Sequence, residues 1–132
     1  MQLLKNNITP DQRLHKAVVD IIHHDRYVAL AGIILMGKRE VNDSIRPQTA
    51  CTNGRDEFYH PVFVEWLSDA ALRYVIIHEN YHKLYKHLVT WQWMFELDAE
   101  CAGKACDYVI NLKIQDDNPD GFATMPMIEE EI

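Results

Sequence analysis

The sequence contains few cysteines and no apolar run long enough to cross a membrane. Its three cysteines, Cys51, Cys101 and Cys106, are odd in number and show no CxxC spacing, which argues against a disulfide framework and against a thiolate zinc knuckle. The longest apolar run, at residues 27–36, is about half a membrane span, and residues 1–14 lack the apolar stretch of a secretory leader. These absences predict a cytoplasmic protein with free thiols and no membrane association.

Basic residues are also scarce. The 132 residues include 13 Lys and Arg against 20 Asp and Glu, which gives a net charge of −7, and the basic residues form no long run. Because binding to nucleic-acid phosphates needs a concentrated positive surface, we do not expect nucleic acid as a partner. Apolar residues make up 48% and charged residues 25%, a composition typical of a packed soluble protein. We expect a single domain over residues 1–132, with the acidic stretch 121–132 as a loose tail.

Hydrophobic periodicity predicts three long helices, at residues 10–24, 70–88 and 95–115. The first helix has Thr9 as its candidate N-cap and Pro10 at the first helical position, and the second has Ser68 and Asp69 at its start. The third contains Gly103, which weakens a helix and is therefore expected to allow close approach of a neighbouring helix.

Two segments predict β-structure, which makes the expected fold class α+β. The apolar stretch 27–37 ends at a glycine and suits a buried strand. Residues 46–61 contain two short β-like pieces around Asn53-Gly54, a dipeptide that favours the tight turn of a β-hairpin. The stretch that follows, residues 61–67, predicts a short helical turn.

The second predicted helix carries the sequence HENYH at residues 78–82. Positions four apart lie on one face of a helix, so His78 and His82 can direct ring nitrogens at one metal ion. Glu79 lies about 100° further round the helix, where it can reach a water molecule beside that ion. This is the HExxH arrangement of zinc peptidases, and composition alone produces roughly 0.02 to 0.03 such matches in a chain of this length. The motif predicts a zinc site with Glu79 as general base.

A catalytic zinc ion usually has three protein ligands, so a third ligand is needed. The third predicted helix carries a polar stripe of Glu96, Glu100, Asp107 and Asn111 at spacings of 4, 7 and 4. Such a stripe is usually a solvated face, but opposite two histidines it supplies candidate ligands, of which Asp107 and Glu100 lead. His87 lies nine residues after His78, about half a turn away from its face, and ranks below both carboxylates.

These segments together resemble a known family. Residues 49–87, followed by ACDYVIN at 105–111, are similar to the metallopeptidase domain often found ahead of a von Willebrand A-like domain in bacterial and phage proteins. That family has a Thr-Asp/Asn-Gly turn, a Tyr-Asn-Pro-x-Phe segment, an HExxH helix and an Ala-Ala-Asp-Tyr-x-Ile-Asn segment. The resemblance covers about residues 10–115, and the ordered segments are far more specific than HExxH alone.

The resemblance implies a zincin-like fold, in which a small β-sheet or hairpin packs against long helices. It implies zinc bound by His78, His82 and Asp107, with Glu79 as general base, and so favours Asp107 over Glu100. It also implies a protein or peptide substrate, held by β-augmentation at the strand near residues 48–52 or at its hairpin partner.

Two positions depart from the family pattern. His60 stands where the family usually has Asn, and Ala102-Gly103 replaces Trp-Asn. These changes concern the substrate pocket more than the metal site.

Two functions compete for this sequence. The first is a zinc-dependent peptidase, and the second is a catalytically silent interaction module that keeps the same fold. Glu79 favours the peptidase, because a purely structural zinc site has no use for a base beside the metal. The small size of the chain and the lack of a recognisable substrate-binding extension favour the module.

Overall fold

The computed structural model describes residues 8–85, 92–116 and 120–126, and it has the mixed α+β architecture that the sequence predicts. The helical elements are α2 (Pro10–Ile22), the 3-10 helix η1 (Val28–Leu30), α3 (Ala31–Ile34), α4 (Pro61–Trp66), α5 (Asp69–Tyr85), α7 (Gln92–Leu97) and α8 (Ala99–Asp116). The strands are β1 (Arg39–Val41), β2 (Ala50–Thr52) and β3 (Glu57–Tyr59). In these described ranges, no helix is both long enough and apolar enough to span a membrane.

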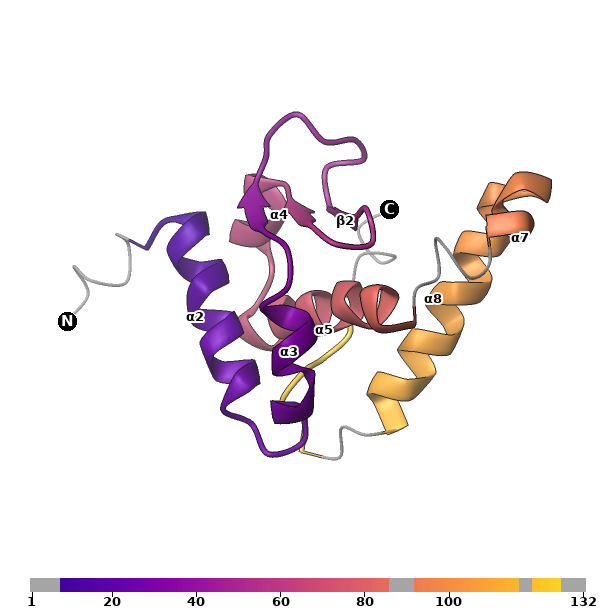
Figure 1. The fold of residues 1–132 in the computed structure, drawn as a ribbon. Coiled ribbons are helices and arrows are strands. Elements are labelled where there is room, and N and C mark those ends of the chain that lie inside the picture. The colour runs from indigo at the N-terminus through magenta and orange to yellow at the C-terminus, as the bar shows by residue number, and fades with distance from the viewer. Residues whose placement is uncertain (1–7, 86–91, 117–119, 127–132) are drawn as a thin grey trace.

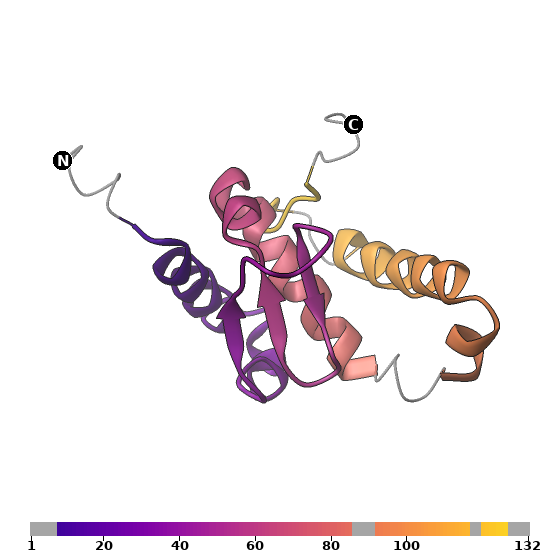
Figure 2. The same cartoon turned by 90° about the horizontal axis from the view of Figure 1, so that it is seen from above.

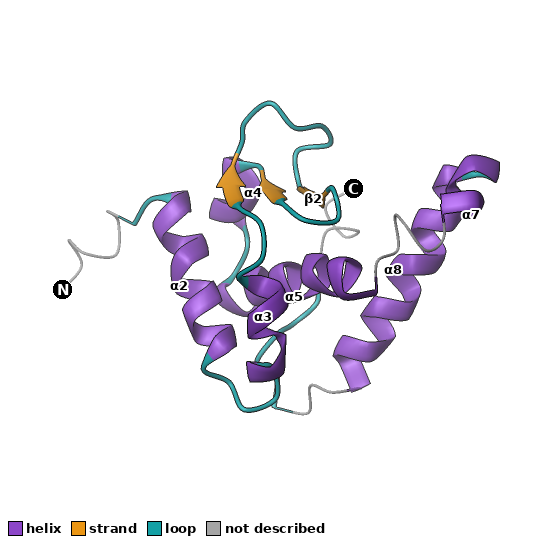
Figure 3. Ribbon diagram, viewed as in Figure 1, coloured by secondary structure: helices purple, strands orange, loops and turns teal. Residues whose placement is uncertain are grey.

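Helix α5 lies at the centre of the fold. The strands form one sheet in the order β1-β3-β2, in which β1 is parallel and β2 antiparallel to β3. The sheet covers one side of α5, and α2 and α8 flank the helix on opposite sides (Figures 1 and 2). Figure 3 shows how small the sheet is beside the helices. The sheet, α2 and α8 are therefore positioned by their packing against α5.

The predicted helix starts are confirmed. Thr9 and Gln12 form a reciprocal capping box, in which the side chain of each accepts a hydrogen bond from the backbone N–H of the other. At the start of α5, the Ser68 hydroxyl accepts a hydrogen bond from the backbone N–H of Ala71. His60 caps α4, since its Nδ1 accepts from the backbone N–H of Val62. Asparagine is also a preferred N-cap residue, so His60 can serve the same purpose as the family's Asn.

The hairpin prediction is confirmed, but the strand prediction for residues 27–37 is wrong. Strands β2 and β3 pair across a turn in which Gly54 has a positive φ of 97°. Residues 28–34 instead form η1 and α3. Leu30 and Ile34 are both buried while Val28 and Leu35 are exposed, so burial in this run follows the four-residue spacing of a helix.

The third predicted helix is broken in two at Asp98. Its carboxylate accepts a hydrogen bond from the backbone N–H of Cys101 and so caps α8. Glu96 therefore belongs to α7 and does not continue the polar stripe of α8. Among the described residues, no atom lies within 4 Å of a Cβ added at Gly103, so the close helix approach expected there is not found in this part of the chain.

The stretch expected to be a loose tail packs on the core over its described part. Ala123 is buried, and the ring of its neighbour Phe122 packs at a tilt against the His24 ring, with ring centroids 4.2 Å apart. The guanidinium of Arg73 lies over the Phe122 ring and donates to the Phe122 carbonyl. Aromatic and cation–π contacts thus hold this segment beside α5, while residues 127–132 lie outside the described part of the chain.

A buried ionic cluster fixes β3 against α5. Glu57 and Lys83 have fully buried side chains, and Lys83 Nζ lies 2.8 Å from Glu57 Oε2. Arg39 binds the same carboxylate through two nitrogens, and the Tyr59 hydroxyl donates to it. Burial raises the pKa of Glu57, but the hydrogen bonds and charges of Arg39 and Lys83 outweigh burial and hold that pKa below its usual range.

We expect Glu57→Gln to lower the free energy of unfolding at pH 7 by about 3–5 kcal/mol, because it leaves Lys83 buried without its counter-charge. The pKa of Glu57 is lower in the folded state than in the unfolded state. The contribution of Glu57 to the free energy of unfolding is therefore present above the unfolded pKa of about 4.5 and is lost as the pH falls through the folded pKa.

Urea unfolding of both proteins across a pH series measures this effect. The difference between wild type and variant is expected to shrink in acid. Glu40→Gln on β1, which removes a partly exposed carboxylate, is the matched control. A difference that stays constant with pH would contradict the assignment.

Candidate metal centre

Two histidines of α5 meet one aspartate of α8. His78 Nε2 lies 3.1 Å and His82 Nε2 lies 2.9 Å from the same Asp107 Oδ1 atom. The two Nε2 atoms are 3.2 Å apart. The histidine side chains are largely buried, whereas the carboxylate of Asp107 is half exposed. The structure therefore brings together the three side chains that the sequence and the family resemblance selected.

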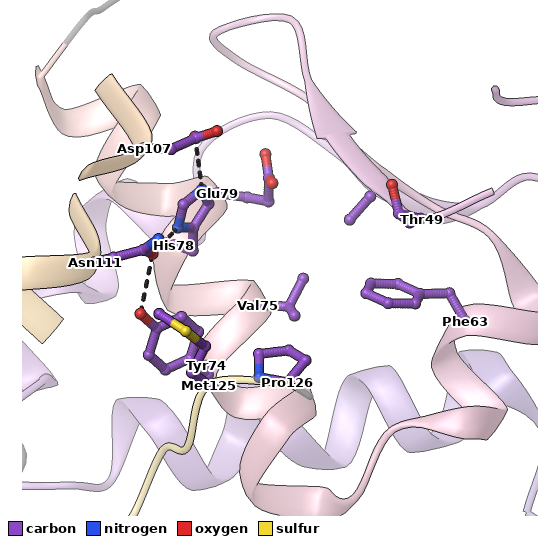
Figure 4. Close-up of a pocket in the computed structure, with 11 residues that line it drawn as sticks. Thr49, Phe63, Tyr74, Val75, His78, Glu79, Asp107, Asn111, Met125 and Pro126 are labelled. Atoms are coloured by element: carbon purple, nitrogen blue, oxygen red, sulfur yellow. Dashed lines mark hydrogen bonds and ion pairs between the residues drawn. The ribbon is translucent and has the colours of Figure 1, made fainter. Parts of the chain in front are cut away.

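The ring of His78 is oriented from behind by Asn111. The amide oxygen of Asn111 lies 2.9 Å from His78 Nδ1 and also accepts a hydrogen bond from the Tyr74 hydroxyl (Figure 4). Burial raises the pKa of Tyr74 to about 12, so its hydroxyl keeps its proton at neutral pH and acts as the donor. Because an amide oxygen only accepts, His78 must donate from Nδ1, and in the neutral ring Nε2 keeps a free lone pair.

The donor set fits a tetrahedral zinc ion. Ligand atoms at about 2.0–2.1 Å from zinc lie about 3.3 Å from one another at tetrahedral angles. The three observed separations, 2.9, 3.1 and 3.2 Å, are close to this value. Two imidazoles and one carboxylate are a ligand set that catalytic zinc sites use, and such a set leaves one position for solvent or substrate. The orientation of His78 by Asn111 is also of the kind that supports metal ligands.

Burial and ion pairing shift the pKa values of the cluster residues in opposite directions. Burial raises the pKa of Asp107, but hydrogen bonds and charges from His78 and His82 outweigh it and hold that pKa well below its usual range. Burial lowers the pKa of His78, but the Asp107 carboxylate and the charge of Glu79 raise it above its ordinary value. Asp107 is therefore ionised at neutral pH, which is the form that binds a cation.

Glu79 lies beside the cluster and lines a pocket of about 300 Å³. Only 8% of the residue is exposed, and burial is the main cause that raises the pKa of its carboxyl group, partly offset by His78 and His82. In Figure 4 its side chain lies between His78 and Thr49, in the opening between α5 and the sheet. It therefore lies next to the proposed metal position and in contact with the space open to a substrate.

The pocket has walls from several parts of the chain. Its lining residues are Thr49, Ala50, Phe63, Tyr74, Val75, His78, Glu79, Asp107, Asn111, Met125 and Pro126 (Figure 4). Sequence reasoning missed Tyr74, Met125 and Pro126. Tyr74 lies four residues before His78, a spacing that places it on the same helix face and that offered a usable signal. No periodic pattern connects Met125 and Pro126 to the site.

The other candidate ligands lie elsewhere. Glu100 on α8 is exposed, with an ion pair to Lys104 at 3.2 Å. It belongs to no group that could hold a metal ion in the described part of the chain, where the only such group is His78, His82 and Asp107. Glu96 is on α7, and His87 lies outside the described residues.

We expect purified protein to contain about one zinc ion per chain, the stoichiometry of a site with three protein ligands. His78→Ala and Asp107→Ala are expected to lose the ion, and Asn111→Ala to weaken binding about 10–100-fold because the His78 ring loses its orientation. Elemental analysis and competition with a chelator measure both quantities.

The matched control is Glu100→Ala, which removes a carboxylate from the same helix but outside the cluster. It should keep the ion. Zinc that is retained by Asp107→Ala and lost by Glu100→Ala would contradict the ligand set.

Comparison with protein families matches residues 9–129 to the family described as "putative metallopeptidase domain". Neither the curated proteins nor the solved structures give a match. The matched range contains the HENYH segment, Asp107 and Asn111, and it covers nearly the whole chain. The chain therefore belongs to this metallopeptidase-domain family.

Proposed function

We propose that this protein is a zinc-dependent peptidase in which His78, His82 and Asp107 hold the ion and Glu79 is the general base. The observation that carries the proposal is the convergence of three ligand atoms within 3.2 Å of one another, beside a buried glutamate in an open pocket. A zinc ion held there supplies a Lewis acid, which polarises the scissile carbonyl and lowers the pKa of a water molecule.

Glu79 is the group in the pocket suited to move the proton. Burial raises the pKa of Glu79 towards the range in which a carboxylate is an effective base. It accepts a proton from the water molecule that attacks the peptide carbonyl carbon. It then gives that proton to the amine as the C–N bond breaks. The open pocket allows a peptide to enter while Glu79 itself stays buried.

Strand β2 offers a backbone edge for the peptide. The sheet order places β2 at an edge, and Thr49 and Ala50 line the pocket with Glu79. Hydrogen-bonded pairs alternate along antiparallel strands. The bonds from His60 N–H to the Thr49 carbonyl and from Asn53 N–H to the Asp56 carbonyl make Cys51 and Phe58 the next bonded pair. The N–H and C=O of Ala50 therefore face away from β3 and are available for β-augmentation.

We expect Glu79→Gln to abolish turnover and to leave zinc content unchanged, because the amide keeps the size of the side chain but does not accept the proton. General-base catalysis contributes about 10²–10⁴-fold, so kcat should fall by at least that factor. Cleavage of a randomised decapeptide pool, followed by mass spectrometry, measures the effect. The matched control is Glu65→Gln on α4, an exposed carboxylate outside the pocket.

Wild-type protein that contains zinc but cleaves nothing in the pool would favour a catalytically silent interaction module. In that case peptide binding would be equal in wild type and Glu79→Gln.

A proline at position 50 tests the edge strand. Ala50→Pro removes an N–H that faces away from β3, so we expect KM to rise by about 2–10-fold with little change in kcat. Thr49→Pro is a weaker test, because the Thr49 N–H already donates to the Pro47 carbonyl within the chain. Ala50→Ser, which keeps the N–H, is the control. An unchanged KM in a proline variant of normal thermal stability would count against β-augmentation.

A further inference from the structure

A second hollow lies along α8 next to the proposed active site. It has a volume of about 540 Å³ and is lined by Lys104, Asp107, Tyr108, Asn111, Leu112, Gln115 and Met125. Asp107, Asn111 and Met125 also line the pocket that contains Glu79. The two spaces therefore meet at the proposed metal ligand itself. We call the second space the α8 groove.

The α8 groove has four exposed lining residues, Lys104, Tyr108, Leu112 and Gln115, of which Tyr108 and Leu112 form an apolar pair. Tyr108 is 71% and Leu112 60% exposed, and the two residues lie one turn apart on the same face of the helix. Single exposed apolar residues are common on protein surfaces. Tyr108 and Leu112 differ from such single residues because both line the same groove. Met125, from the C-terminal segment, is a third apolar residue in its lining.

Two polar side chains at the groove, Lys104 and Gln115, already have partners. Lys104 pairs with Glu100 at 3.2 Å, and the side-chain amide of Gln115 lies 4.0 Å from the Met125 sulfur. A charged ligand would have to compete with these contacts. An apolar group would cover Tyr108 and Leu112 without displacing a partner, and it would gain free energy by removing their surface from water.

We propose that the α8 groove is a substrate subsite, which takes a bulky apolar side chain of the peptide within two residues of the scissile bond. This inference rests on the proposed peptidase function and adds the substrate class. The peptide backbone follows the β2 edge across the pocket, and the side chain enters the groove past Asp107 and Met125. The groove can hold a side chain as large as phenylalanine. The protein is thus a peptidase that selects peptides with Leu, Met or Phe beside the cleaved bond.

The test compares two substitutions of equal chemistry on the same helix. Leu112→Glu places a charge in the groove, and Val109→Glu places the same charge at a residue that is 55% exposed but does not line the groove. Tyr108→Ser is a second groove variant. All three positions are exposed, so circular dichroism and thermal unfolding should match the wild type.

Two readouts separate this inference from the peptidase proposal. Wild type and each variant are incubated with a randomised decapeptide pool, and the cleaved bonds are identified by mass spectrometry. The same pool is passed over immobilised Glu79→Gln protein with and without each groove substitution, and the bound peptides are sequenced.

In both readouts we expect Leu, Met and Phe to be enriched about tenfold over Ala at one position. The enrichment should be lost in Leu112→Glu, reduced in Tyr108→Ser and kept in Val109→Glu. Enrichment that persists in Leu112→Glu, or no apolar enrichment at all, would overturn the subsite. Groove-dependent binding without cleavage by the wild type would refute the peptidase and leave the groove as a binding site for an apolar side chain of an uncleaved peptide, whereas the absence of both binding and cleavage would refute both.

Discussion

Helix α5 is surrounded by other elements on nearly every side, and this burial is the constraint on which the rest of the structure depends. A buried polar group without a partner is costly, so each polar side chain on α5 needs a partner from a neighbouring element or from its own backbone. Lys83 reaches Glu57 on β3, and the side-chain amide of Asn80 donates to the Ile76 carbonyl one turn back. The first contact fixes the sheet against α5 and so determines which strand edge borders the pocket.

The same constraint determines how α8 lies on α5. The buried residues of α8 are Ala102, Cys106, Ile110 and Ile114, which recur every four residues and form one apolar stripe. Asp107 and Asn111 each follow a residue of that stripe by one position, so they lie at its border, where α8 meets the histidines of α5. Apolar packing thus determines the register of the two helices, and the polar pair at the border completes the cluster. The half exposure of Asp107 follows from that border position.

Much of the fold and of the site could be predicted from the sequence because the signals were local. The proposed metal-binding pair of HENYH is recognised from helix spacing, and the helix starts and the hairpin are recognised from capping and turn residues. Each of these signals involves residues that are close together in the sequence. The choice of Asp107 over Glu100 came from the family resemblance, since helix spacing alone left both residues open. The strand prediction for residues 27–37 was wrong because a short apolar segment suits a strand or a helix equally. Only packing against α5 and α2 determines which of the two forms. The part of the pocket formed by Met125 and Pro126 could not be predicted, because the position of this C-terminal segment depends on contacts such as Arg73 with Phe122. Such contacts join residues far apart in sequence.

Glu79 differs from the other ionisable residues on the buried side of α5. Within the described part of the chain, its carboxylate accepts no hydrogen bond, whereas Lys83, His78 and His82 all have close partners. A carboxylate with a purely structural role would be expected to bind a donor, as Glu57 does, because the bond offsets the loss of water. Without one, its pKa is raised by burial, and the group remains free to accept a proton from a molecule in the pocket. Burial of Glu79 that is offset only in part, by the charges of His78 and His82, is what the proposed catalysis requires of a general base.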